Sequence, residues 1–91
     1  MNKVKAYLIS FDMLGQEDTK SIAITAPNEK EAKAIFERWA TIKSMLGDVV
    51  GVVVQPLRKN AKNAHMITED YYKKQLLFLD QLEQMYKVHA Q

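Results

Sequence analysis

The chain contains no cysteine, only three glycines and two prolines, and no long apolar run in its 91 residues. The lack of cysteine excludes disulfide bonds, thiolate nucleophiles and thiolate metal ligands together. The sequence shows neither a dinucleotide-binding glycine motif nor a phosphate-binding loop. No stretch reaches the ~20 apolar residues of a membrane span, and the first apolar run lacks a small-residue cleavage site. We therefore expect a cytoplasmic protein without a membrane segment.

The chain also has little excess of one charge over the other. Thirteen basic and eleven acidic residues leave a formal net charge of +2, with 47% apolar and 26% charged residues. These values exclude an acidic disordered tail, a collagen-like chain and a low-complexity linker. The length suits a single small domain over residues 1–91. Without disulfides, this domain must fold by packing alone or with the help of a partner subunit.

Three segments have the patterns of strands. Residues 4–13 alternate with apolar side chains on both faces, which indicates a central strand. A turn around Gly15 separates them from residues 20–25, and the pair predicts a β-hairpin whose second strand lies at an edge. Residues 48–57 contain a nearly continuous run of valines, which indicates a strand covered on both faces.

Two segments have the patterns of helices. Asn28 and Glu31 form a helix start signal, apolar residues follow at helical spacing, and Gly47 is predicted to end this first helix. The second helix begins near Thr68 and extends to about residue 88. Its apolar residues spread over roughly 180° at ~100° per residue, which is more than one small sheet can cover.

The element order predicts an α+β fold of the form β-β-α-β-α. The simplest arrangement is a three-stranded antiparallel sheet in the order 2-1-3, with the first helix on one face. The long C-terminal helix then packs on the other face or on a partner. This helix has more apolar surface than the sheet can cover. Because a large exposed apolar patch is unusual on a soluble monomer, the surplus predicts a homodimer or a different protein partner.

Residues able to carry catalysis are sparse. The two histidines, His65 and His89, are interpreted as exposed, and no serine lies in a nucleophile motif. Acidic pairs occur at turns and helix starts, where capping and the helix dipole explain them. His65 with Glu69 and Asp70 matches no known metal-ligand spacing. We predict a protein that is not an enzyme and that has no cofactor, metal or small-molecule substrate.

The last helix contains the first candidate site. Tyr, Phe and Met are enriched at protein interfaces, and here they recur at seven-residue spacing. The first hypothesis is therefore a small module that binds another protein and forms a homodimer. By analogy of size and style, such proteins are common among phage and mobile-element accessory factors, including inhibitors. The predicted interface residues are Tyr71, Tyr72, Leu77, Phe78, Leu82, Met85 and Tyr86.

A basic segment at residues 58–65 is the second candidate site. No acidic residue occurs between Asp48 and Glu69, and the predicted strand order brings the start of the first strand close to this segment. Such a patch could contact phosphates, so the alternative function is a small dimeric nucleic-acid-binding regulator. The candidate nucleic-acid contacts are Lys3, Lys5, Arg58, Lys59 and Lys62.

Overall fold

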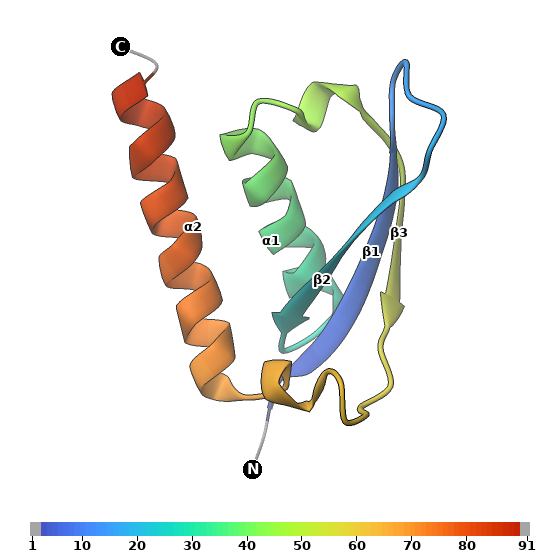
Figure 1. The fold of residues 1–91 in the computed structure, drawn as a ribbon, viewed down its shortest axis with the longest axis vertical. Helices are drawn as coiled ribbons and strands as arrows, with labels where there is room; N and C mark the ends of the chain where they lie inside the picture. The colour runs from blue at the N-terminus through green and yellow to red at the C-terminus, as the bar shows by residue number, and fades with distance from the viewer. Residues whose placement is uncertain (1–2, 90–91) are drawn as a thin grey trace.

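The computed structural model describes residues 3–89, and side chains only as far as residue 87. The strands pair antiparallel in the order β2-β1-β3, and the element order β-β-α-β-α is the predicted one (Figure 1). The elements are β1 (Lys5–Met13), β2 (Lys20–Ala26), α1 (Glu29–Ile42), β3 (Val49–Pro56) and α2 (Glu69–His89), with 3-10 turns at Leu46–Asp48 and Ala64–Met66.

The core lies between the helices and one face of the sheet. Tyr7, Ile9 and Phe11 alternate along β1 on this face, and each is at most 5% exposed. Phe36 of α1 packs on them, with its ring centroid 4.9 Å from that of Phe11. β1 is the central strand, as its apolar residues on both faces predict, and Ala6 on its other face is also buried, at 1% exposed.

Both helices begin where the sequence predicts, and each start has a side-chain cap, which was predicted for Asn28. The Oδ1 atom of Asn28 accepts a hydrogen bond from the N–H of Glu31 at 2.9 Å, and Thr68 Oγ1 accepts one from the N–H of Tyr71 at 3.0 Å. Each bond satisfies a backbone donor in the first turn that has no partner within the helix.

The end of α1 differs from the prediction, because the helix stops at Ile42 and not at Gly47. Ser44 has a left-handed φ of 58°. The N–H groups of Ser44 and Met45 donate back to carbonyls of the last turn at 2.9 Å, the hydrogen-bond pattern of a Schellman motif. Met45 then packs against the core, which is the apolar contact that accompanies this motif. Gly47 lies beyond the helix in the 3-10 turn.

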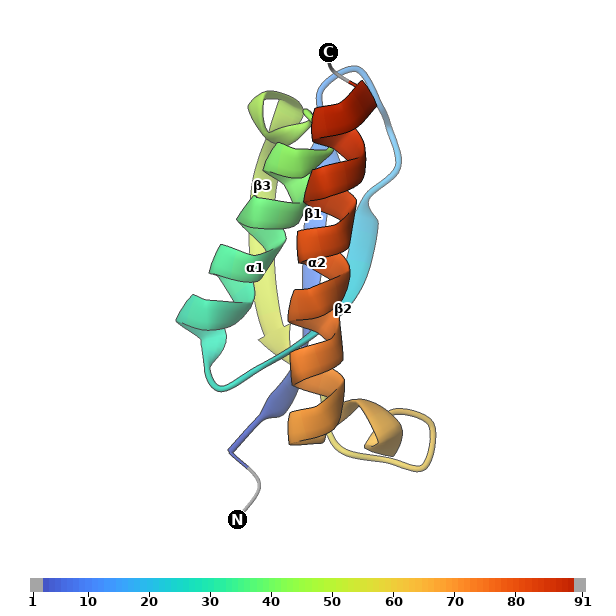
Figure 2. The ribbon, with the colours of Figure 1, turned by 90° about the vertical axis from the view of Figure 1, so that its left-hand side faces the viewer.

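The last helix lies on the same side of the sheet as α1. Figures 1 and 2 show α2 beside α1, with the strands behind both helices in Figure 2. Leu79 is 3% exposed and belongs to the core cluster that includes α1 and β2. An ion pair joins Arg38 Nη2 of α1 to Asp80 Oδ1 of α2 at 2.6 Å. The sequence predicted that this helix packs on the opposite face of the sheet or on a partner. Within the chain, α2 does not cover the opposite face, because its buried side chains pack against apolar residues of α1 and β2.

The opposite face of the sheet is only partly covered. Thr25 is fully buried there, and its Oγ1 donates to the Met66 carbonyl at 2.7 Å, so the turn before α2 covers this end. Farther along, Val50 and Val53 of β3 are 43% and 50% exposed. The prediction that the valine strand is covered on both faces is therefore wrong. Valine favours an extended backbone on exposed as well as buried faces.

Candidate functional site

Four of the predicted interface residues share one side of α2. At ~100° per residue, they fall within an arc of about 60° that runs along the helix axis. Phe78 and Met85 are each 57% exposed, although they are large apolar side chains. We call this group the α2 stripe, and it consists of Tyr71, Phe78, Leu82 and Met85.

The other three predicted interface residues lie elsewhere on the helix. Tyr72 packs against the core, and burial, followed by the charges of Glu31 and Glu69, raises the pKa of its hydroxyl. Tyr86 is 42% exposed and lies between the α2 stripe and the buried side of α2. Leu77 is 58% exposed but points about 100° away from Phe78 around the helix axis. The structure therefore does not bring these three residues into the stripe.

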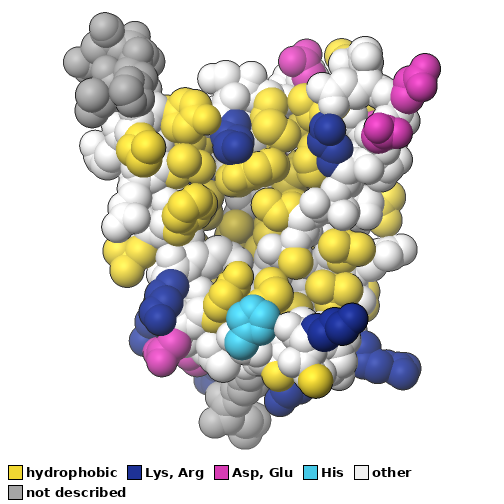
Figure 3. All heavy atoms as spheres, viewed as in Figure 1, with side chains coloured by type: hydrophobic (Ala, Val, Ile, Leu, Met, Phe, Trp, Pro, Cys, Tyr) yellow, Lys and Arg dark blue, Asp and Glu magenta, His cyan; other side chains and the backbone are white. Residues whose placement is uncertain are grey.

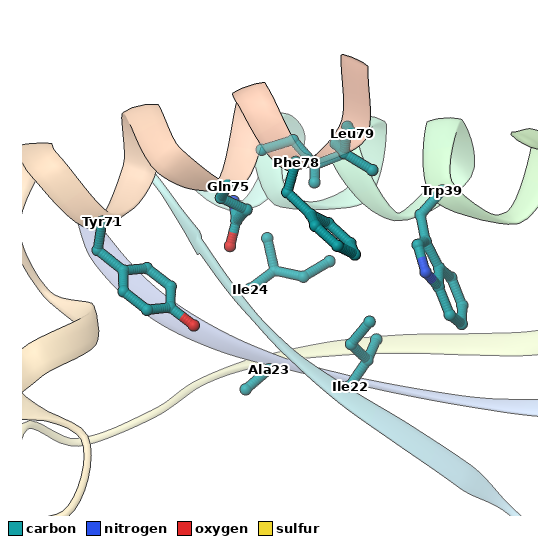
Figure 4. A pocket seen from close by; sticks show the side chains of 9 residues that line it. Ile22, Ala23, Ile24, Trp39, Tyr71, Gln75, Phe78 and Leu79 are labelled. Atoms are coloured by element: carbon teal, nitrogen blue, oxygen red, sulfur yellow. The ribbon is translucent and has the colours of Figure 1, made fainter. Parts of the chain in front are cut away.

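The α2 stripe borders a hollow between α2, α1 and the outer edge of β2. Its volume is about 200 Å³. In Figure 4, Tyr71, Phe78 and Trp39 point from the two helices toward β2, and Ile22 and Ile24 point back at them. We call this hollow the α2–β2 groove, and it is lined by Ile22, Ala23, Ile24, Ile35, Trp39, Tyr71, Gln75, Phe78 and Leu79.

None of the groove residues from β2 and α1 was predicted as a site residue. Trp39 of α1 is only partly buried and forms one wall of the groove. Lys43 Nζ lies 5.2 Å from the centre of its ring. The predicted edge position of β2 could have identified Ile22 and Ala23 as site residues. An unpaired edge strand next to exposed apolar helix surface is a common place for a partner to bind.

Gln75, one of the residues that line the groove, makes a double hydrogen bond to β2. Its Oε1 accepts from the Thr25 N–H at 3.0 Å, and its Nε2 donates to the Thr25 carbonyl at 2.7 Å. In an antiparallel pair, successive residues direct their N–H and C=O groups alternately toward and away from the partner strand. The Thr25 groups therefore point away from β1, and the Gln75 amide occupies the place of a residue in a further strand.

The surface beside the groove carries a basic residue. From Gln75 toward the start of β2, the backbone of β2 diverges from that of α2 (Figures 1 and 2). Among the described residues that line this hollow and the shallower one beside it, the charged one is Lys74. Figure 3 shows hydrophobic side chains extending from α2 across the hollow to the strands, with basic side chains near the upper end of this surface and acidic ones beyond them at the upper right.

The predicted basic patch lies at the opposite end of the molecule from the β1–β2 turn. The N–H of Leu57 donates to the Ala6 carbonyl at 2.9 Å, so the start of β1 and the chain after β3 run side by side. Continuing the register of Tyr7 with Pro56 by two residues places Lys5 opposite Arg58. The structure therefore brings together the two segments that carry the candidate contacts, and all of these are exposed: Lys3, Lys5, Arg58, Lys59 and Lys62.

The sequence offers two histidines as the candidates for catalysis or metal binding. The ring of His65 packs edge-on against Tyr71 at 5.9 Å between centroids, and the side chain of His89 lies outside the described residues. Within the described part of the chain, no three His, Asp or Glu side chains gather as metal ligands would. Burial, helped by the charge of Glu29, raises the pKa of Tyr7, a core residue.

Two further findings bear on function. Among residues 3–89, no helix combines the length and apolar character that crossing a membrane requires. Comparison of the chain with protein-family models, with curated proteins and with solved structures finds no match.

Proposed function

We propose that this protein is a non-enzymatic module that binds another protein through the α2–β2 groove. The observation that supports this function most directly is the position of Phe78. Its ring is 57% exposed, yet it lies in a hollow between Trp39 and Ile22 and not on a bare helix surface. Concave apolar surface with aromatic walls is typical of sites where a few side chains of a partner supply most of the binding energy.

Two neighbouring residues of α2 allow a matched test. Phe78→Glu places a charge in the groove, whereas Leu77→Glu places the same charge on the bare side of the helix, at a residue of nearly equal exposure (57% and 58%). We expect Phe78→Glu to weaken binding to a partner captured from the native host by about a hundredfold, a loss of ~2.7 kcal/mol. Leu77→Glu should bind as the wild type does. Circular dichroism shows whether both variants remain folded, and equal binding by the two variants would contradict the proposal.

Several finer expectations from the sequence stay predictions. Light scattering on a size-exclusion column tests the homodimer, and cell fractionation tests the cytoplasmic location. A role as a phage or mobile-element accessory factor rests on the analogy of size alone. The near-neutral net charge of +2 disfavours a mimic of acidic DNA among such roles.

The second candidate function is binding of nucleic acid at the basic patch. The observation that favours it is the hydrogen bond from the Leu57 N–H to the Ala6 carbonyl, which brings together two basic segments that are about fifty residues apart in the sequence. Exposed lysine and arginine side chains at such a patch can contact phosphates. A salt series in a gel-shift assay tests this alternative, as set out in the Discussion.

A further inference from the structure

We infer that the partner enters the α2–β2 groove as an extended segment and pairs with β2 as a fourth strand of the sheet. This inference rests on the proposed function and specifies the chemistry of the partner. It needs three properties of the groove: free backbone groups along the edge of β2, apolar cover above the added strand, and a charge that selects the segment.

The free backbone groups belong to Ala23 and Ser21. The outward direction of the Thr25 groups is fixed by their bonds to Gln75, and every second residue of β2 repeats that direction. Within residues 3–89, β2 is an edge strand, and no other strand pairs with its outer side. A segment placed alongside can therefore make four backbone hydrogen bonds, two with Ala23 and two with Ser21, starting where the Gln75 amide ends.

The α2 stripe supplies apolar cover for this position. Gln75 can reach the outward groups of Thr25 in the plane of the sheet only if α2 extends past the edge of β2. Phe78 then lies above the place of the added strand, and Figure 4 shows its ring pointing down toward β2. Side chains of a strand alternate between two faces, so every second residue of the partner would meet Phe78 and Trp39. An alternating apolar segment fits this arrangement.

Because α2 extends past the edge of β2, a second copy of the chain is a poor occupant of the groove. If two copies paired antiparallel through their β2 edges, a two-fold axis perpendicular to the sheet would relate them, and both α2 helices would lie on the same face above the paired strands. Neighbouring strands are ~4.8 Å apart, whereas helices need ~8–10 Å between their axes. A segment without its own covering helix avoids this clash.

Charge complementarity favours a segment with acidic residues. Lys74 lies beside the groove on α2, Lys43 lies against the ring of Trp39, and Lys20 begins β2. The ion-paired Asp80 and Glu83 both bond to Arg38 on the side of α2 that faces α1, away from the groove. An extended segment with apolar residues at alternate positions and acidic residues between or beside them meets both the walls and the charge.

Proline at position 23 separates strand pairing from other ways of filling the groove. Ala23→Pro removes the outward N–H and blocks the approach of a strand, but spares the β1–β2 ladder because that N–H does not bond to β1. Ala23→Val keeps the N–H and is the matched control. The probe is a library of random linear peptides selected on the wild-type protein. We expect selected peptides with alternating apolar and acidic residues, and binding about tenfold or more weaker to Ala23→Pro but unchanged for Ala23→Val.

Amide hydrogen exchange on the wild-type protein gives a second measurement that does not depend on how well the proline variant folds. Binding of a selected peptide should slow exchange at the N–H groups of Ala23 and Ser21 and leave Ile22, which already bonds to β1, unchanged. Equal binding to Ala23→Pro and Ala23→Val without new protection would overturn the inference, and so would a dimer that Ala23→Pro converts to a monomer. The proposed function would survive the first of these results if Phe78→Glu still lost its partner, so the two failures are distinguishable.

Discussion

The double hydrogen bond between Gln75 and Thr25 makes a measurable contribution to stability. Gln75→Met keeps the length of the side chain but leaves the N–H and the carbonyl of Thr25 without these partners. Each such bond is worth ~0.5–1.5 kcal/mol net, so we expect a loss of about 1–3 kcal/mol in the free energy of unfolding. In a domain of this size, each kcal/mol corresponds to a shift of ~4–8 °C in Tm.

Gln75→Glu adds a pH dependence whose sign follows from the geometry. A carboxylate can accept from the Thr25 N–H, but it has no proton for the Thr25 carbonyl, so repulsion raises the pKa of the new carboxyl in the folded state. The folded state then keeps its proton to a higher pH than the unfolded state does. The stability of this variant should therefore be highest below the ordinary glutamate pKa of ~4.3 and fall as the pH rises through the raised value.

Urea denaturation followed by Trp39 fluorescence measures both effects across this pH range. The matched controls are Gln81→Met and Gln81→Glu, because Gln81 is exposed on the same helix. If Gln75→Met changed the free energy of unfolding by less than about 0.5 kcal/mol, the value expected of an ordinary surface change, the bonds would not hold α2 to β2. If Gln75→Glu showed no more pH dependence than Gln81→Glu, the donated bond to the Thr25 carbonyl would be refuted.

Three further predictions concern other parts of the molecule. Gly51→Ala puts a Cβ on a residue with a φ of 64°, so we expect a loss of about 1–2 kcal/mol in urea denaturation, and a neutral result would contradict this. Burial raises the pKa of Tyr7, so its contribution to stability is complete below pH ~10 and is lost as the pH rises further. Tyr7→Phe should then show a shallower alkaline fall in stability than the wild type. In gel-shift assays, alanine at Arg58, Lys59 and Lys62 should reduce the log–log salt slope by ~0.9 for each lost phosphate contact with duplex DNA, and unchanged weak binding would exclude the nucleic-acid alternative.

The elements and the β1–β2 hairpin could be predicted because they depend on local patterns. The alternation of β1 marks a central strand, and the short hairpin turn around Gly15 fixes β2 as its neighbour. The side-chain cap at Asn28 marks the start of α1 in the same local way. Such signals depend on neighbours within a few residues, so the sequence displays them directly.

The position of α2 and the composition of the groove depend on contacts between distant residues. Gln75 is one of several polar residues on its helix, and nothing adjacent in the sequence indicates that it bonds to Thr25, fifty positions away. The valine run was misleading because high strand propensity does not show which face of a strand is buried. The interface prediction included the four residues of the α2 stripe, but spacing alone could not separate Phe78 from Leu77.

The double hydrogen bond of Gln75 fixes where an added strand can begin. Gln75 already holds the outward N–H and carbonyl of Thr25, so an inserted segment cannot pair with this residue. Pairing is left to Ala23 and Ser21, toward Lys20 at the start of β2. We therefore expect every bound segment to pair in one register, so that the reversed sequence of the same composition would fit poorly.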